Sequence, residues 1–115
     1  MSTFSTHVLD ISRGFPAVGV PVLLELQNTK GAWQELAKGL TNADGRVPDL
    51  LPKGTLFKPG IYRITFETTI YFEKMNIDSF YPYVSILFER KQNDDRHHHV
   101  PLLLSPYGYS TYRGS

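Results

Sequence analysis

Histidines near both ends of the chain are the residues best suited to chemistry. His97 and His99 stand two positions apart, so on a β-strand their side chains point to one face while that of His98 points to the other. Two imidazoles on one strand face can serve as general bases near neutral pH or share a metal ion. We expect them to form half of a polar site, with the other half supplied from elsewhere in the chain or by another subunit.

The other candidates are a histidine in the first expected strand, an arginine after a turn, and polar residues at the carboxyl end. They are His7, Arg46, Tyr112, Arg113 and Ser115. A lone histidine in a strand is more often a hydrogen-bonded or surface residue than a catalyst, and an arginine that follows Asp44 and Gly45 is ordinarily solvated. The residues alone therefore leave open a hydrolytic site, a zinc site formed by His7, His97 and His99, and a purely structural explanation.

Composition excludes several classes of function. The chain has 115 residues, 41% hydrophobic and 13% aromatic, a formal charge of +1 and zero cysteines. We expect one globular domain, residues 1–115, with no affinity for nucleic acid, no disulfide, no thiolate chemistry and no cysteine-based zinc site. No apolar run approaches the roughly 20 residues that cross a bilayer, and the first ten residues lack the pattern of a secretory signal. These features favour the cytoplasm, with a peroxisomal location as the alternative.

Short segments with alternating apolar and polar residues must position the candidate side chains. Turn-forming sequences separate them, notably Asn-Thr-Lys-Gly at 28–31 and Asn-Ala-Asp-Gly at 42–45. The expected strands are residues 4–10, 18–27, 33–40, 46–47, 60–68, 81–90, 100–104 and 107–112. One helix is expected at 69–76, with Thr69 as its N-cap. The pattern predicts an all-β fold, a two-sheet β-sandwich of seven to eight strands with one short helix.

Five segments spread over the chain carry a family resemblance. They are residues 5–10 (STHVLD), 14–17 (GFPA), 42–46 (NADGR), 80–84 (FYPYV) and 97–115, which ends in YSTYRGS. The chain resembles the transthyretin-related 5-hydroxyisourate hydrolases of urate breakdown. The carboxyl-terminal motif distinguishes these enzymes from transthyretin itself, which shares the fold and carries hormone. His98 departs from the family pattern, which has an aromatic residue there, and should face away from the site.

The resemblance implies a transthyretin-like sandwich that assembles as a homotetramer, with active sites at the dimer–dimer interface and no cofactor. It implies hydrolysis of 5-hydroxyisourate to 2-oxo-4-hydroxy-4-carboxy-5-ureidoimidazoline in purine catabolism. The implied catalytic residues are His7, Arg46, His99 and Ser115. The implied substrate-binding residues are His7, Arg46, Tyr112, Arg113 and Gly114.

These residue types suit ring opening by water. Either His7 or His99 can act as the base, and which one does so stays open. Arg46 can bind an anionic heterocycle, stabilise the oxyanion and disfavour imidazolium nearby. We expect Gly114 to allow close approach of the chain to the substrate, and we favour direct water attack over attack by Ser115. The alternative to an enzyme is a carrier of small aromatic ligands.

Overall fold

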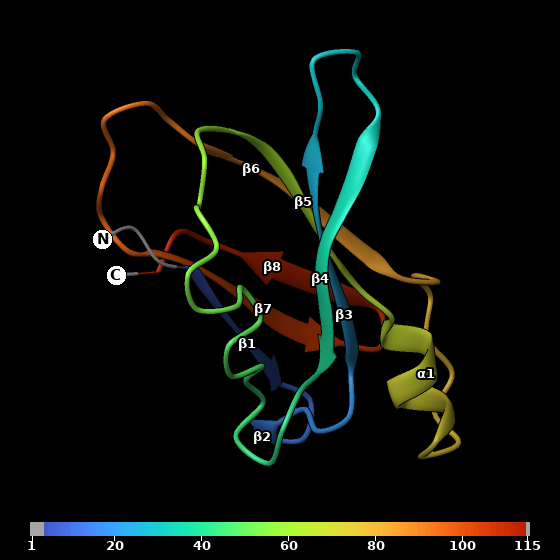
Figure 1. The fold of residues 1–115 in the computed structure, drawn as a ribbon. Helices are drawn as coiled ribbons and strands as arrows, with labels where there is room; N and C mark the ends of the chain where they lie inside the picture. The colour runs from blue at the N-terminus through green and yellow to red at the C-terminus, as the bar shows by residue number, and fades with distance from the viewer. Residues whose placement is uncertain (1–3, 115) are drawn as a thin grey trace.

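Two four-stranded sheets pack face to face in the computed structural model, which describes residues 4–114 (Figure 1). The first sheet contains, in spatial order, β2 (Phe15–Pro16), β1 (Phe4–Asp10), β7 (His98–Ser105) and β8 (Gly108–Thr111). The second contains β4 (Trp33–Leu40), β3 (Pro21–Gln27), β5 (Gly60–Phe66) and β6 (Val84–Arg90). Within the described residues the one helix is α1 (Thr68–Glu73). The predicted sandwich with one short helix is confirmed.

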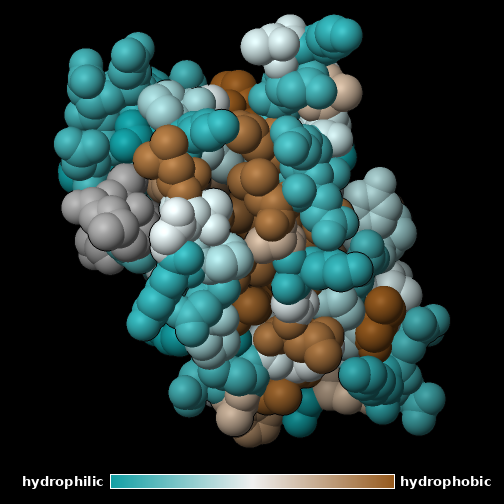
Figure 2. Space-filling model, in the orientation of Figure 1, coloured by the Kyte–Doolittle hydropathy of each residue, from teal (hydrophilic) through white to brown (hydrophobic). Residues whose placement is uncertain are grey.

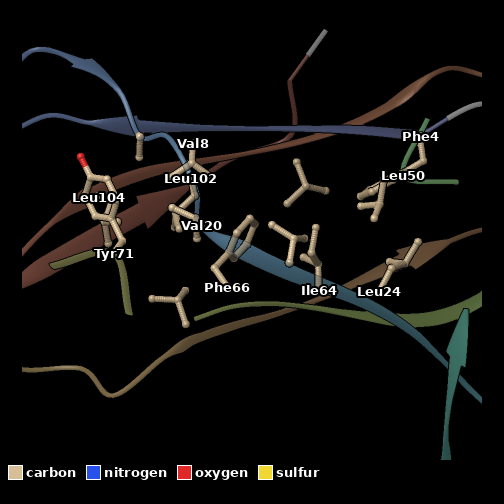
Figure 3. Close-up of a cluster of buried hydrophobic side chains, with 14 of the residues drawn as sticks. Phe4, Val8, Val20, Leu24, Leu50, Ile64, Phe66, Tyr71, Leu102 and Leu104 are labelled. Atoms are coloured by element: carbon tan, nitrogen blue, oxygen red, sulfur yellow. The ribbon is translucent and has the colours of Figure 1, made fainter. Parts of the chain in front are cut away.

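Alternation along the strands builds the core between the sheets. Buried and partly buried residues alternate along all of β1 and over most of β5. Figure 3 shows side chains from both sheets pointing toward one another, and the labelled set includes Val8, Leu102, Ile64 and Phe66, all 0% exposed. Burying one such side chain stabilises the fold by about 1.5–3 kcal/mol. Because the inner positions are used for packing, the outer positions of the same strands are available for chemistry.

Several predicted strand boundaries are wrong for local reasons. The strand expected at 18–27 begins only at Pro21, because Gly19 adopts a φ of 79° and its amide donates to the carbonyl of Thr41. The strand expected at 46–47 is reduced to one isolated bridge between Arg46 and His7. The strand expected at 81–90 begins at Val84. The two-residue strand β2 was not predicted, since it is too short to alternate.

The ends of the helix and of the last strands also differ from expectation. The helix spans Thr68–Glu73 instead of 69–76, and Thr69 is not its N-cap. The Thr69 hydroxyl instead donates to the carbonyl of Pro82 at 2.7 Å, which ties α1 to the chain before β6. Strand β7 is longer than expected and begins at His98, whereas β8 is shorter. The longer β7 brings the histidine segment into the sheet.

The surface seen in Figure 2 separates polar from apolar regions. Hydrophobic residues form a band down the middle of this face, and hydrophilic residues cover the β3–β4 turn and the loop that follows β6. No helix within residues 4–114 is long and apolar enough to cross a membrane.

Candidate active site

The parallel pairing of β1 with β7 brings the two histidine segments together. Ser5 lies opposite His99, and His7 lies opposite Pro101 two positions further along. Figure 1 shows these two strands side by side in the middle of the first sheet. Ser5, His7 and His99 are partly buried, whereas their neighbours Thr6 and His98 are buried on the core side. The outer face of this strand pair therefore carries the candidate site.

A tight turn places Arg46 beside His7. The Asn42 side-chain oxygen accepts hydrogen bonds from the amides of Asp44 at 2.9 Å and Arg46 at 3.1 Å, which closes the turn. The amide of Val8 donates to the carbonyl of Gly45 at 2.8 Å. A side chain on Gly45 would collide with the β1 backbone, and its φ of 75° favours glycine. The turn is therefore docked on β1, and Arg46 forms a bridge to His7.

Gly114 packs directly on the His99 imidazole. Its amide donates to the carbonyl of His99 at 2.8 Å, and the two residues form an isolated antiparallel bridge. A Cβ atom at position 114 would overlap Cδ2 of the His99 ring. The glycine therefore allows the chain to lie against His99, and its predicted close approach to the substrate stays a prediction.

Ser5 joins His97 and His99 on the outer face. Its Oγ lies 2.7 Å from Nε2 of His97 and 2.7 Å from Nδ1 of His99. The two imidazoles are nearly parallel, with ring centroids 6.4 Å apart. The prediction that His97 and His99 share a face is confirmed, but the sequence analysis gave no role to Ser5. Its position two residues before His7 on the same strand is the signal that could have found it.

The electrostatics of the site favour the neutral forms of His7 and His99. Burial lowers the pKa of His7, and the Arg46 guanidinium lowers it further. Burial also lowers the pKa of His99, helped by Arg46, His97 and His7. The sequence predicted the effect of the guanidinium, whereas burial is the larger cause at both positions. A neutral imidazole near pH 7 can accept a proton, as a general base must.

Arg113 contacts the loop before β7. Its guanidinium contacts the Asp94 carboxylate at 3.3 Å, and the same carboxylate binds Arg96 at 3.0 Å. His98 Nε2 lies 3.8 Å from Asp94, and its Nδ1 is 2.7 Å from the carbonyl of Arg96. The predicted orientation of His98 away from the site is confirmed. The structure does not bring Arg113 to His7 and Arg46, because its partner belongs to the loop before β7.

Tyr112 is exposed, with 58% of its surface accessible. A cavity of about 260 Å³ between β6 and the chain after β8 is lined by Tyr112 and Arg113 together with His98 and His99. Ser115 lies outside the described residues. Tyr112 thus stands next to the histidine segment, in a cavity that β6 also lines.

Comparison with known proteins decides the family. Residues 4–114 match the HIUase/Transthyretin family over their whole length. The chain belongs to this family.

The chain is similar to one curated relative and to two solved structures. The chain is 47% identical over 111 residues to the 5-hydroxyisourate hydrolase of Salmonella dublin, covering 96% of this chain and 79% of the relative. The structure of Klebsiella pneumoniae 5-hydroxyisourate hydrolase superposes with a TM-score of 0.85 at 41% identity and covers all of both chains. Sea bream transthyretin in complex with thyroxine gives a TM-score of 0.90 at 29% identity, covering 96% and 93% of the two chains. The predicted resemblance is confirmed.

The zinc hypothesis finds no support in this family member. Among residues 4–114, no three His, Cys, Asp or Glu side chains form a group that could hold a metal ion. His97 and His99 turn a nitrogen toward Ser5, and His7 lies beside a fixed positive charge. Zinc bound by His7, His97 and His99 therefore stays an untested alternative without a preformed three-ligand group in residues 4–114.

Proposed function

We propose that the chain is a 5-hydroxyisourate hydrolase, a cyclic amide hydrolase of purine catabolism that yields 2-oxo-4-hydroxy-4-carboxy-5-ureidoimidazoline. The observation that carries the proposal is an arginine whose backbone bridges to His7 on β1, and whose positive charge helps to lower the pKa values of His7 and His99. The related hydrolases span nearly the whole chain at 41–47% identity, which supports the same activity.

The geometry supports direct attack of water on a ring carbonyl. His99 or His7 accepts a proton from the water as its oxygen bonds to the carbonyl carbon. Arg46 binds the anionic heterocycle and stabilises the negative charge that develops on the carbonyl oxygen. Tyr112 and the backbone at Gly114 border the histidine segment and are proposed to hydrogen-bond the flat substrate. We assign no nucleophilic role to Ser115.

We further propose a homotetramer in which the sites lie at the dimer–dimer interface. Edge strands β6 and β8 expose Leu87 and Tyr109, at 62% and 41%, so a second copy pairing there would cover them. The outer face that holds Ser5, His7 and His99 needs a second wall to enclose a substrate. A cytoplasmic location, with the peroxisome as alternative, stays a prediction.

The test is the ultraviolet decay of freshly generated 5-hydroxyisourate, with and without the protein, from pH 6 to pH 9. We expect the protein to accelerate the decay, with an acid limb set by the neutral histidine that acts as base. Decay at the uncatalysed rate over the whole pH range would reject the hydrolase.

The second candidate is a carrier, since sea bream transthyretin in complex with thyroxine has the same fold. A carrier of apolar ligands needs an apolar channel, whereas His7 and His99 make this face polar and Arg46 adds a positive charge. Tight binding of a hydrophobic aromatic ligand by calorimetry, combined with no turnover, would favour the carrier.

A further inference from the structure

The serine between the two histidines is the feature that the proposed mechanism does not use. Ser5 Oγ is 2.7 Å from His97 Nε2 and 2.7 Å from His99 Nδ1. Ser5 belongs to β1, whereas the histidines lie 92 and 94 positions later in the chain. The three side chains form a continuous hydrogen-bonded chain from the partly buried His99 to the exposed His97.

A hydroxyl has one proton to donate, which constrains the two imidazoles. If Ser5 donates to one ring nitrogen, it must accept a hydrogen bond from an N–H on the other ring. Two arrangements satisfy this condition with neutral histidines. In the first, His99 carries its proton on Nδ1 and donates it to Ser5, and Ser5 donates to Nε2 of His97. In the second, His97 carries its proton on Nε2 and donates to Ser5, and Ser5 donates to Nδ1 of His99.

The proposed mechanism selects the first arrangement. Gly114 packs against the Cδ2 edge of the His99 ring, and Ser5 engages Nδ1, so Nε2 is the nitrogen left for water or substrate. A base at Nε2 must have its lone pair there, which places the proton on Nδ1. His99 then donates to Ser5, and Ser5 donates to Nε2 of His97.

We propose that Ser5 and His97 form a proton relay that carries the proton of the attacking water from His99 toward solvent. This inference rests on the proposed hydrolase function and deepens it. As the water oxygen bonds to the carbonyl carbon, its O–H bond breaks and His99 Nε2 gains that proton. His99 Nδ1 passes its own proton to Ser5 Oγ, and Ser5 passes its hydroxyl proton to His97 Nε2. His97 ends as the imidazolium, and His99 is neutral with its proton now on Nε2. As the ring C–N bond breaks, this Nε2 proton goes to the leaving nitrogen, and a proton returning from His97 through Ser5 restores the Nδ1–H form.

The charges around the relay favour movement in this direction. Burial, Arg46, His97 and His7 all lower the pKa of His99, so a proton held there is disfavoured. His97 is exposed and can exchange its proton with water. By lowering the pKa of His99, Arg46 and His7 also help to move the proton away from the site.

A serine that only orients His99 is the competing explanation. Orientation needs the Ser5 hydroxyl but does not need His97, whereas a relay needs both. The experiment must therefore vary each residue alone and both together.

The decisive experiment measures kcat and KM of Ser5→Ala, His97→Gln and the double variant in the full chain. We expect kcat to fall about 10-fold in each, below the 10²–10⁴ range for loss of a complete acid–base group, with KM nearly unchanged. The double variant should be no slower than either single one, because each breaks the same path. Ser5→Thr keeps the hydroxyl and should restore most of the rate. Full activity of His97→Gln would overturn the relay.

Ser85→Ala is the matched control. Ser85 is also a strand serine, and its Oγ lies 2.8 Å from Oγ1 of Thr65, but it belongs to the second sheet. It should leave kcat and KM unchanged, so a fall equal to that of Ser5→Ala would overturn the assignment. In His97→Gln, raising the buffer concentration should recover the rate, because a dissolved base can replace the exposed histidine.

A second readout does not depend on turnover. Nitrogen-15 NMR of the histidine side chains should find both His97 and His99 in the Nδ1–H tautomer, and Ser5→Ala should remove this preference. The opposite tautomer at His99 would overturn the proposed direction. If the wild-type protein fails to accelerate the decay of 5-hydroxyisourate, the hydrolase proposal fails. The histidine tautomers still show whether the hydrogen bonds run from His99 through Ser5 to His97.

Discussion

His98 and His99 are consecutive residues with opposite environments, because they lie on opposite faces of the β1–β7 pair. His98 is 4% exposed, packs edge-on against Phe57 at a centroid distance of 5.2 Å, and belongs to the core side. His99 faces outward, binds Ser5 and lies beside Arg46. Because strand alternation separates the faces, we expect substitutions on the inner face to change stability and those on the outer face to change activity.

The inner face should respond most strongly to loss of volume. Leu102, on β7 three residues after His99, is 0% exposed. Leu102→Ala should lower the free energy of unfolding by about 2–5 kcal/mol, through lost burial and the cavity left behind. The folded fraction should keep most of its kcat, as measured by urea unfolding and by the hydrolysis assay at low temperature. A selective loss of kcat in a fully folded variant would contradict the division between faces.

The outer face should respond in the opposite manner. Arg46→Ala should lower kcat/KM by roughly 10²–10³-fold, the range for removing a group that stabilises an oxyanion. Because Arg46 is exposed, the free energy of unfolding should stay within about 0.5 kcal/mol. Arg46→Lys keeps the charge but loses the planar fork, and should recover only part of the rate. A wild-type rate in Arg46→Ala would remove the guanidinium from the mechanism.

The contact between Gly114 and His99 gives a smaller, local test. Gly114→Ala would push a methyl group into the imidazole and displace it, and we expect kcat to fall about 10-fold, as for misplaced catalytic groups. Gly108→Ala is the control, since a Cβ there meets only the Ser105 hydroxyl at 3.8 Å. Steady-state kinetics of both variants make the comparison, and equal rates would show that the close packing has no catalytic effect.

The two neighbouring histidines should differ in their pH dependence. Burial is the main cause that lowers the pKa of His98 in the folded state, so the unfolded chain binds protons more readily. The neutral ring therefore stabilises the fold above pH about 6.5, and this contribution is lost as the pH falls below that value. His98→Phe should flatten the fall of the urea midpoint between pH 7 and pH 5, and leave the acid limb of kcat/KM in place. An unchanged stability profile would contradict the assignment.

The sequence predicted the parts of this structure that depend on alternation. The sandwich, the core face of β5 and the shared face of His97 and His99 all follow from a period of two. What it missed depends on contacts between distant segments. The contact of Arg113 with Asp94 was not foreseen, because Asp94 lies in a loop whose path no local pattern specifies; the assignment of Arg113 to the substrate stays a prediction. Ser5 was overlooked because its role appears only when β1 and β7 pair in the observed register.

That register also has a consequence for biosynthesis. Ser5 and His99 are 94 positions apart, yet they are direct neighbours across two parallel strands. A ribosome adding about 5–20 residues per second needs on the order of 10 s to travel between them. Throughout that interval β1 lacks its neighbour β7, so the site is incomplete and one edge of β1 is unpaired. An unpaired strand edge can pair with other chains, so the amino-terminal strand is open to such pairing until the last strands have been made.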